Sequence, residues 1–229
     1  CGKTTLLRIL VGESTADSGK ITVSSNLTIG YLPQSIAISF DKSPLELCKE
    51  VFIPLRQLQD QITSLQNDLS LNPSDFGLVE KIGSLQHSFE EKGGYQYETS
   101  IDRILQGLGL ANGEENRPWR QLSGGQKMRA YLAKILLENP DLLIFDEPTN
   151  HLDIEAIEWL ESFLKDFHGS VLMVSHDRYF LDQCVDQIWD MTPVFSIYHG
   201  NYSQYLSQRE ANYQRLLLEF EKQQEFIEN

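Results

Sequence analysis

Cysteine is scarce in this sequence, and a long hydrophobic run is missing. The three cysteines, Cys1, Cys48 and Cys184, are odd in number, far apart and without C-x-x-C spacing. This argues against a disulfide framework or a zinc cluster and favours a reducing, cytoplasmic location. The longest uncharged stretch, residues 21–40, contains four serines and Pro33. It cannot supply the roughly 20 mostly apolar residues of a membrane-spanning helix, so no membrane partner is expected.

Basic residues are also few. The chain has 19 Lys and Arg against 33 Asp and Glu, a formal net charge of −14. Because an acidic surface repels phosphate backbones, a general coating of nucleic acid is excluded, and any such contact needs a local basic patch. In other respects the composition is ordinary: 229 residues with 41% hydrophobic and 23% charged side chains describe a soluble globular chain that can bury a core.

Both ends of the sequence suggest a fragment. There is no initiator Met, and Cys1-Gly2-Lys3-Thr4-Thr5 looks like the end of a motif without its beginning. Near the other end, apolar residues repeat every seven positions, at Leu206, Tyr213, Phe220 and Ile227. This repeat predicts a long amphipathic helix from Tyr202 that is cut at Asn229.

The first hundred residues predict short elements and then a hairpin. Apolar residues over 6–11 predict a helix that ends at Gly12, and residues 20–24 and 28–32 predict two strands. From Pro54 the apolar spacing alternates between three and four, at Leu55, Leu58, Ile62, Leu65, Leu69 and, after Asn72-Pro73, at Leu78, Ile82, Leu85 and Phe89. This predicts an antiparallel helical hairpin, which can equally pack on the domain body or contact a partner.

Helix and strand patterns alternate from residue 118 to 197. Helices are predicted over 125–138, 154–165 and 178–184. The apolar runs over 142–145 and 170–174 have the length of buried parallel strands. The pattern therefore predicts an α/β fold with a parallel sheet and helices on its faces.

Gly2-Lys3-Thr4-Thr5 before a helix fits the last part of a P-loop. Successive backbone N–H groups and the helix N-terminus would hold phosphate oxygens. Lys3 would reach the β- and γ-phosphates, and the Thr4 hydroxyl would bind Mg²⁺. The alternative for this short motif alone is a lysine at an exposed helix start.

Two further motifs complement this one. Asp146 and Glu147 follow a four-residue apolar strand, at the edge where α/β sheets bind ligands. Asp146 would hold Mg²⁺, and Glu147 would accept a proton from an attacking water, although surface acids that cap a strand are the alternative. Leu122-Ser123-Gly124-Gly125-Gln126 precedes a helix and offers a hydroxyl and backbone N–H groups as a second anion-binding surface.

The order of these motifs resembles the nucleotide-binding domain of ABC ATPases, an α/β P-loop core with a helical subdomain. The resemblance also rests on Tyr31-Leu32-Pro33-Gln34, Asn150-His151-Leu152-Asp153 and Ser175-His176-Asp177. It implies ATP and Mg²⁺ as cofactors, Gln34 as a sensor of Mg²⁺ and the attacking water, and His176 as a contact of the γ-phosphate. Asp153 would face a partner domain, and it would also cap the helix from Ile154. In this family two such domains pack head to tail, and residues 122–126 close the ATP bound by the other domain.

The amino-acid sequences of several motifs resemble those of the ABC-F group. These are residues 31–34, 147–153, 175–181 and Gly200-Asn201-Tyr202-Ser203-Gln204-Tyr205. Members of this group are soluble, carry two ATPase domains on one chain and act on ribosomes as translation or antibiotic-resistance factors. They also have a helical arm in the first domain and a long linker after it. The resemblance therefore implies a ribosome partner and a second ATPase domain.

Four segments are expected on this basis. They are a truncated ATPase core over 1–45, an inserted hairpin over 46–98, a second part of the core over 99–200, and the start of a linker over 201–229. The second part of the core holds the family's signature motif, residues 122–126, its Walker B strand, residues 143–147, and the switch histidine, His176. The fragment alone is expected to be inactive. Two alternatives remain for the full-length protein: an ATP-gated binding module that needs no turnover, and the ATPase subunit of a transporter.

Overall fold

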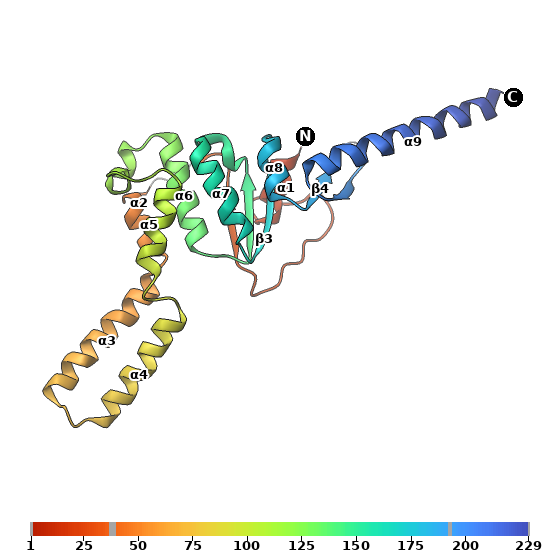
Figure 1. The fold of residues 1–229 in the computed structure, drawn as a ribbon. Coiled ribbons are helices and arrows are strands. Elements are labelled where there is room, and N and C mark those ends of the chain that lie inside the picture. Colours follow the sequence, from red (N-terminus) through yellow and green to blue (C-terminus); the bar gives the residue numbers. More distant parts are fainter. Residues whose placement is uncertain (1, 37–39, 192–193, 229) are drawn as a thin grey trace. The chain divides into compact units, whose positions relative to one another are not determined.

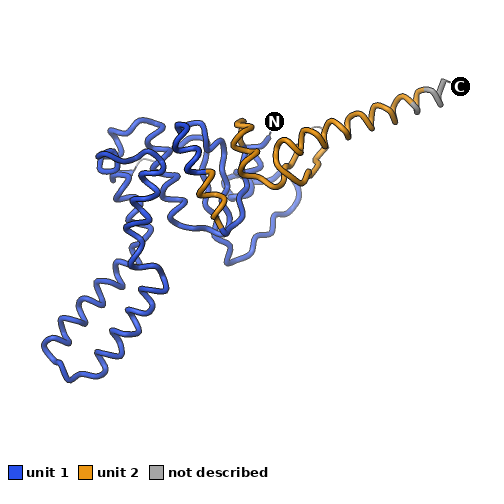
Figure 2. The backbone as a smooth tube through the Cα atoms, viewed as in Figure 1, with its two compact units in different colours: residues 1–160, 168–174 blue, residues 161–167, 175–229 orange. Residues whose placement is uncertain are grey.

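The computed structural model describes residues 2–36, 40–191 and 194–228. It divides into two compact units, which Figure 2 shows in separate colours. The first unit contains residues 1–160 and 168–174, and the second contains residues 161–167 and 175–229. Each unit is described by itself.

A three-stranded parallel sheet lies at the centre of the first unit. Its order is β1 (Ile29–Leu32), β2 (Leu142–Asp146), β3 (Ser170–Val174). The central strand pairs in register from Ile29↔Leu142 on one side to Asp146↔Val174 on the other. Its residues Leu143, Ile144 and Phe145 are fully buried. The predicted α/β class with a parallel sheet is confirmed.

Two strand predictions need correction. Residues 20–24 form no strand: Ile21 and Val23 are 43% and 48% exposed, and no described strand pairs with them. A short β-prone segment has no stable ladder without a neighbouring strand. In addition, β3 lies at the edge of the described sheet, so its residues 171–174 are half-buried and not fully buried as predicted.

Helices α1 (Lys3–Leu10) and α6 (Gly124–Leu137) contact this sheet, and α2 (Pro44–Glu50) and α5 (Tyr97–Gly107) pack on α6. The first part of α7 (Ile154–Lys165) belongs to the same unit. Three short 3₁₀ segments, η1 (Glu114–Asn116), η2 (Trp119–Gln121) and η3 (Pro148–His151), connect them. Helix α6 supplies much of the core, because Ala130, Leu132, Ala133, Ile135 and Leu136 are all buried.

The predicted hairpin consists of α3 (Ile53–Leu71) and α4 (Phe76–Glu91), which run antiparallel (Figure 1). Pro54 occupies the first turn of α3, where its missing N–H costs nothing. The Asp75 carboxylate caps α4 by accepting hydrogen bonds from the backbone N–H groups of Gly77 and Leu78. Ile62 and Ile82, both at predicted seam positions, are buried.

The second unit contains α8 (Arg178–Cys184), the antiparallel pair β4 (Gln187–Asp190) and β5 (Ser196–His199), and α9 (Tyr202–Glu228). The predicted long helix from Tyr202 is therefore present. Its repeat residues Leu206, Tyr213 and Phe220 are exposed, whereas the side chain of Ile227 lies outside the described residues. Among the described helices, none is long and apolar enough to cross a membrane.

The cysteines carry no disulfide in the described chain. Cys48 and Cys184 are both free, and Cys1 lies outside the described residues. Burial raises the pKa of each of the two described thiols to about 12. Both thiols are therefore protonated and unreactive near neutral pH, which is typical of cysteines that only fill a core.

Candidate functional site

Two acidic side chains emerge from the carboxyl end of β2. Asp146 is the last residue of the strand and is 1% exposed, and Glu147 follows it and is 9% exposed. The backbone N–H of Glu147 donates to the carbonyl of Val174 at 2.8 Å, which continues the pairing with β3 by one residue. Two carboxylates are thus held inside the protein at the edge where parallel sheets bind ligands.

The backbone of Glu147 is strained. Its φ is +57° and its ψ is +59°, a left-handed conformation that costs a non-glycine residue about 1–2 kcal/mol. Such strain is concentrated at functional sites, where the surrounding structure holds it in place. Sequence reasoning found the carboxylate but missed this conformation. The only signal was Pro148, which disfavours the right-handed helical conformation for the residue before it.

The environment of Asp146 fits a magnesium ion. Its Oδ2 atom is buried and has no hydrogen-bond partner among the described atoms, which is costly for a carboxylate unless a cation compensates it. The described residues contain no cluster of three or more His, Cys, Asp or Glu side chains that could hold a metal alone. Magnesium is usually bound by one or two carboxylates together with water and substrate phosphates, so a metal that arrives with a nucleotide suits this site.

The other two predicted magnesium ligands, Thr4 and Gln34, make no hydrogen bond to Asp146 among the described residues. Thr4 is in the first turn of α1, and Gln34 is exposed just after β1.

The start of α1 presents free backbone donors. Gly2 is the N-cap, and its carbonyl accepts from the N–H of Leu6 at 2.9 Å. The N–H groups of Lys3, Thr4 and Thr5 precede the first intrahelical bond and point out of the helix end. A helix end of this kind with a lysine in its first turn suits a phosphate group, which is the role that the sequence motif predicts for it.

The start of α6 is built as a capping box. The Ser123 hydroxyl oxygen accepts from the Gln126 N–H at 3.2 Å, and the Gln126 side-chain oxygen accepts from the Ser123 N–H at 2.9 Å. The amide of Gln126 also donates to Glu114 at 2.8 Å, so this side chain holds the loop. Ser123 and Gly124 are exposed, and the N–H groups of Gly124 and Gly125 have no acceptor within the helix because they lie in its first turn. A Cβ at Gly124 would meet nothing within 4 Å, so the space before this helix end is open.

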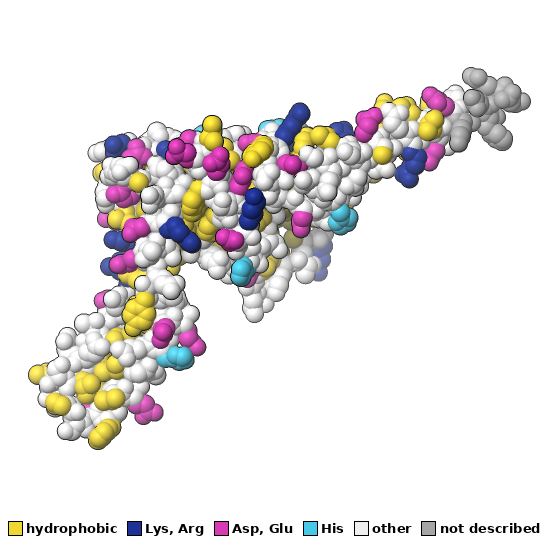
Figure 3. All heavy atoms as spheres, in the orientation of Figure 1, with side chains coloured by type: hydrophobic (Ala, Val, Ile, Leu, Met, Phe, Trp, Pro, Cys, Tyr) yellow, Lys and Arg dark blue, Asp and Glu magenta, His cyan; other side chains and the backbone are white. Residues whose placement is uncertain are grey.

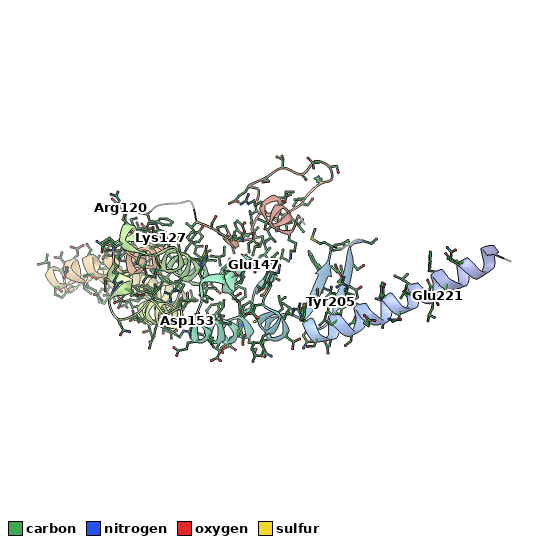
Figure 4. The ribbon with its side chains drawn as sticks, turned by 90° about the horizontal axis from the view of Figure 1, so that it is seen from above. Arg120, Lys127, Glu147, Asp153, Tyr205 and Glu221 are labelled. Atoms are coloured by element: carbon green, nitrogen blue, oxygen red, sulfur yellow. The ribbon has the colours of Figure 1, made fainter. Side chains whose placement is uncertain are left out.

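Asp153 has the structural role that the sequence predicts for it. Its Oδ1 accepts from the N–H of Ala156 at 2.9 Å and so caps α7, as expected. Its Oδ2 lies 3.8 Å from Nη1 of Arg129 on α6. The same Nη1 donates to the carbonyls of Leu108 and Gly109, which follow α5, at 3.2 and 3.3 Å. Figure 4 labels Glu147 and Asp153 at the two ends of the loop that joins β2 to α7.

Arg129 was missed by sequence reasoning. It ties together α6, the end of α5 and the loop before α7, although its carbonyl partners are 20 and 21 residues away in sequence. The only available signal was its place three residues after Gln126, on the same face of the helix.

His176 belongs to the second unit. It is exposed and stands two residues after the last residue of β3 along the chain. The following residue, Asp177, caps α8 by accepting from the N–H of Phe180 at 3.0 Å. His176 is therefore placed by a short link between a strand of one unit and a capped helix of the other.

Comparison with known proteins agrees with the motifs. The family model described as ABC transporter matches residues 1–150. The putative ATP-binding protein YdiF of Bacillus subtilis is 42% identical over 99% of this chain and 36% of its own length. The energy-dependent translational throttle protein EttA of Escherichia coli K12 is 36% identical over 91% of this chain and 38% of its length. ABC transporter F family member 2 of Arabidopsis thaliana is 36% identical over 99% of this chain and 34% of its own length.

Solved structures show the same fold. The archaeal ribosome recycling factor aABCE1, in complex with the ribosomal stalk protein aP1, is 25% identical with a TM-score of 0.56 and covers 88% of this chain and 31% of that chain. The ATP-binding cassette MJ0796 bound to ADP and Pi is 21% identical with a TM-score of 0.51 and covers 82% of this chain and 75% of that chain. At this identity the similarity supports the fold alone. The chain spans only 32–44% of the length of three curated relatives that it matches.

Proposed function

Because the chain belongs to the ABC family of ATP-binding domains and has relatives in the F group, we propose that its full-length protein hydrolyses Mg-ATP to act on the ribosome. The single observation that carries the hydrolase proposal is the end of β2. There Glu147 is held buried in a strained conformation beside the buried and incompletely paired Asp146.

The residues divide the work between binding and proton transfer. The N–H groups from Gly2 to Thr5 and the Lys3 ammonium bind the phosphates. Thr4, Asp146 and Gln34 hold Mg²⁺, which neutralises phosphate charge when bound. Glu147 accepts the proton of the attacking water, and His176 contacts the γ-phosphate.

A second ATPase domain completes each site in this proposal. The open helix end at Ser123, Gly124 and Gly125 contacts the nucleotide of that partner domain, and Gln126 holds the loop in place. Asp153 faces the partner across the same interface. The four segments 1–45, 46–98, 99–200 and 201–229 keep their expected roles as core, hairpin, core and linker.

The ribosome is proposed as the partner for two reasons. One relative is named a translational throttle, and one structural neighbour is a ribosome recycling factor. The hairpin α3–α4 and the helix α9 also extend the chain beyond what ATP chemistry requires. The proposed location is therefore the cytoplasm.

Fractionation of cells that express the full-length protein tests this proposal. The protein is expected to co-purify with ribosomes, and more strongly when ATP hydrolysis is blocked. Co-purification with membranes instead would favour a transporter subunit. Single-turnover hydrolysis separates an ATPase from a binding module that only closes on ATP.

A further inference from the structure

Glu114 of η1 is an acid that contacts the start of α6. Its Oε1 atom accepts a hydrogen bond from Nε2 of Gln126 at 2.8 Å, and its side chain is 25% exposed. A carboxylate repels a phosphate group, so an acid next to a helix end that is proposed to bind phosphate is unfavourable by charge alone. The contact with Gln126 therefore has to contribute something that offsets this repulsion.

The charge of Glu114 is partly neutralised by Arg117. The Nη1 atom of Arg117 lies 3.7 Å from Oε1 of Glu114. Figure 3 shows the same mixing more widely, with acidic and basic side chains interspersed on the visible face of the first unit. Where the two signs offset each other in this way, a phosphate is held by the orientation of local donors more than by net charge.

Glu114 fixes the orientation of the Gln126 amide. A side-chain amide has two orientations that exchange its oxygen and its NH₂ group. The capping box needs the oxygen to face the Ser123 N–H, which donates to it at 2.9 Å, because the reverse orientation would set two donors against each other. An ionised carboxylate can only accept hydrogen bonds, so Glu114 favours the orientation in which Nε2 points toward it.

This orientation decides which donors at the helix start are left for a phosphate. The Ser123 hydroxyl oxygen accepts from the Gln126 N–H at 3.2 Å, so the hydroxyl hydrogen is left as a donor. The first-turn N–H groups of Gly124 and Gly125 are donors without an intrahelical acceptor. Reversal of the Gln126 amide would open the capping box and release this arrangement.

The neighbouring acid, Glu115, holds the turn itself. Its Oε2 accepts from the N–H of Gly113 at 2.9 Å, and its Oε1 accepts from Nδ2 of Asn116 at 2.9 Å. The two acids thus have separate contacts, within the turn for Glu115 and to the helix start for Glu114. Glu115 is therefore the matched control for Glu114.

We propose that Glu114 is a positioning residue for ATP hydrolysis, acting on the nucleotide of the partner domain through Gln126. It holds the Gln126 amide in the orientation that keeps the Ser123 hydroxyl and the first-turn N–H groups of α6 ready for the phosphate. This inference rests on the proposed function and deepens it, because it adds a side chain outside residues 122–126 to the surface that closes on that nucleotide.

Hydrogen–deuterium exchange over residues 122–128 of the full-length protein, without nucleotide, tests the contact itself. In Glu114→Ala the backbone N–H groups of Ser123 and Gln126 should exchange about tenfold faster than in the wild type, because the capping box opens. Glu114→Gln should give an intermediate rate, since its amide oxygen can still accept from Nε2. Glu115→Ala should exchange over this segment like the wild type.

Steady-state ATP hydrolysis by the same proteins tests the positioning role. In Glu114→Ala, kcat should fall by about tenfold, while the Kd for ATP stays within about twofold because α1 binds the phosphates separately. Glu114→Gln should recover part of the loss, and Glu115→Ala should keep the wild-type kcat. In the Gln126→Ala background, Glu114→Ala should cause no further loss, because no amide remains to be oriented. Thermal unfolding checks that every variant folds.

Three results would overturn the inference. They are a wild-type kcat in Glu114→Ala, an equal loss of kcat in Glu115→Ala, and a loss by Glu114→Ala that persists in full in the Gln126→Ala background. Absence of ATP hydrolysis by the wild-type full-length protein would instead overturn the proposed function, and the positioning role with it.

Discussion

At the scale of single residues, contacts between distant parts of the chain hold the candidate site: the Glu147 N–H donates to Val174, and Arg129 donates to the carbonyls of Leu108 and Gly109. Asp146 and Glu147 could be predicted because an apolar strand followed by acids is a local pattern. The left-handed backbone of Glu147 could not, since it depends on the pairing of its N–H with Val174 on another strand. Arg129 was missed for the same reason, because its acceptors come from distant parts of the chain.

Arg129 is predicted to stabilise the first unit. Arg129→Gln removes a charged donor from two backbone carbonyls and from Asp153, so the free energy of unfolding should fall by about 1–3 kcal/mol. Arg129→Lys keeps the charge but loses the planar guanidinium group, so its free energy of unfolding should lie between those of the wild type and Arg129→Gln. Denaturant unfolding measures this order, and equal stability of all three proteins would contradict the assigned contacts.

Tyr205 is predicted to make the stability of the second unit depend on alkaline pH. Burial, and then the hydrogen bond that its hydroxyl donates to Asp190 at 2.8 Å, raise the Tyr205 pKa to about 12. The unfolded phenol ionises near its ordinary pKa of 10.0. The folded state therefore favours the protonated phenol, and its contribution is complete below about pH 10 and is lost as the pH rises toward 12.

Tyr205→Phe provides the control for this pH dependence. The variant keeps the ring that packs on Tyr198 but cannot ionise. It should be less stable than the wild type at neutral pH, and the difference in melting temperature should shrink between about pH 10 and 12. A constant difference over this range would show that the Tyr205 hydroxyl does not have the assigned environment.

At the scale of elements, strongly periodic segments were predicted well. Helices 154–165 and 178–184 and strand 170–174 have the predicted bounds, because apolar spacing and capping residues are local signals. The prediction of a strand over 20–24 was wrong, because a strand needs a neighbouring strand to pair with, and the sequence of the segment does not show whether one is present.

Shortening the hairpin tests its separation from the ATPase core. Removing residues 65–71 and 76–82 from the full-length protein deletes one heptad from each helix and keeps the seam in register. Basal ATPase activity should stay within about twofold, because the site residues lie on other elements, and ribosome-stimulated turnover should drop. Loss of basal activity would show that the hairpin is part of the core.

At the scale of the whole molecule, the chain carries two helix ends that are proposed to bind phosphate, at α1 and at α6. In the proposed function they serve two different nucleotides, so a single domain cannot close a complete site. Its relatives are two to three times longer, which leaves room for the second domain.

Residues 1–229 alone are therefore predicted to hydrolyse ATP at least about a hundredfold more slowly than the full-length protein. A malachite-green phosphate assay on both proteins compares them at equal concentration. Robust hydrolysis by the isolated chain that disappears in Lys3→Ala would show that no partner domain is needed.

The central claim is that Glu147 accepts the proton of the attacking water. Single-turnover hydrolysis of ATP by the full-length protein, measured for the wild type and Glu147→Gln, tests it most directly. The variant keeps the size and hydrogen bonding of the side chain, so nucleotide binding should be retained while the hydrolysis rate falls by about a hundredfold or more. An unchanged rate in a variant that binds ATP normally would contradict the claim.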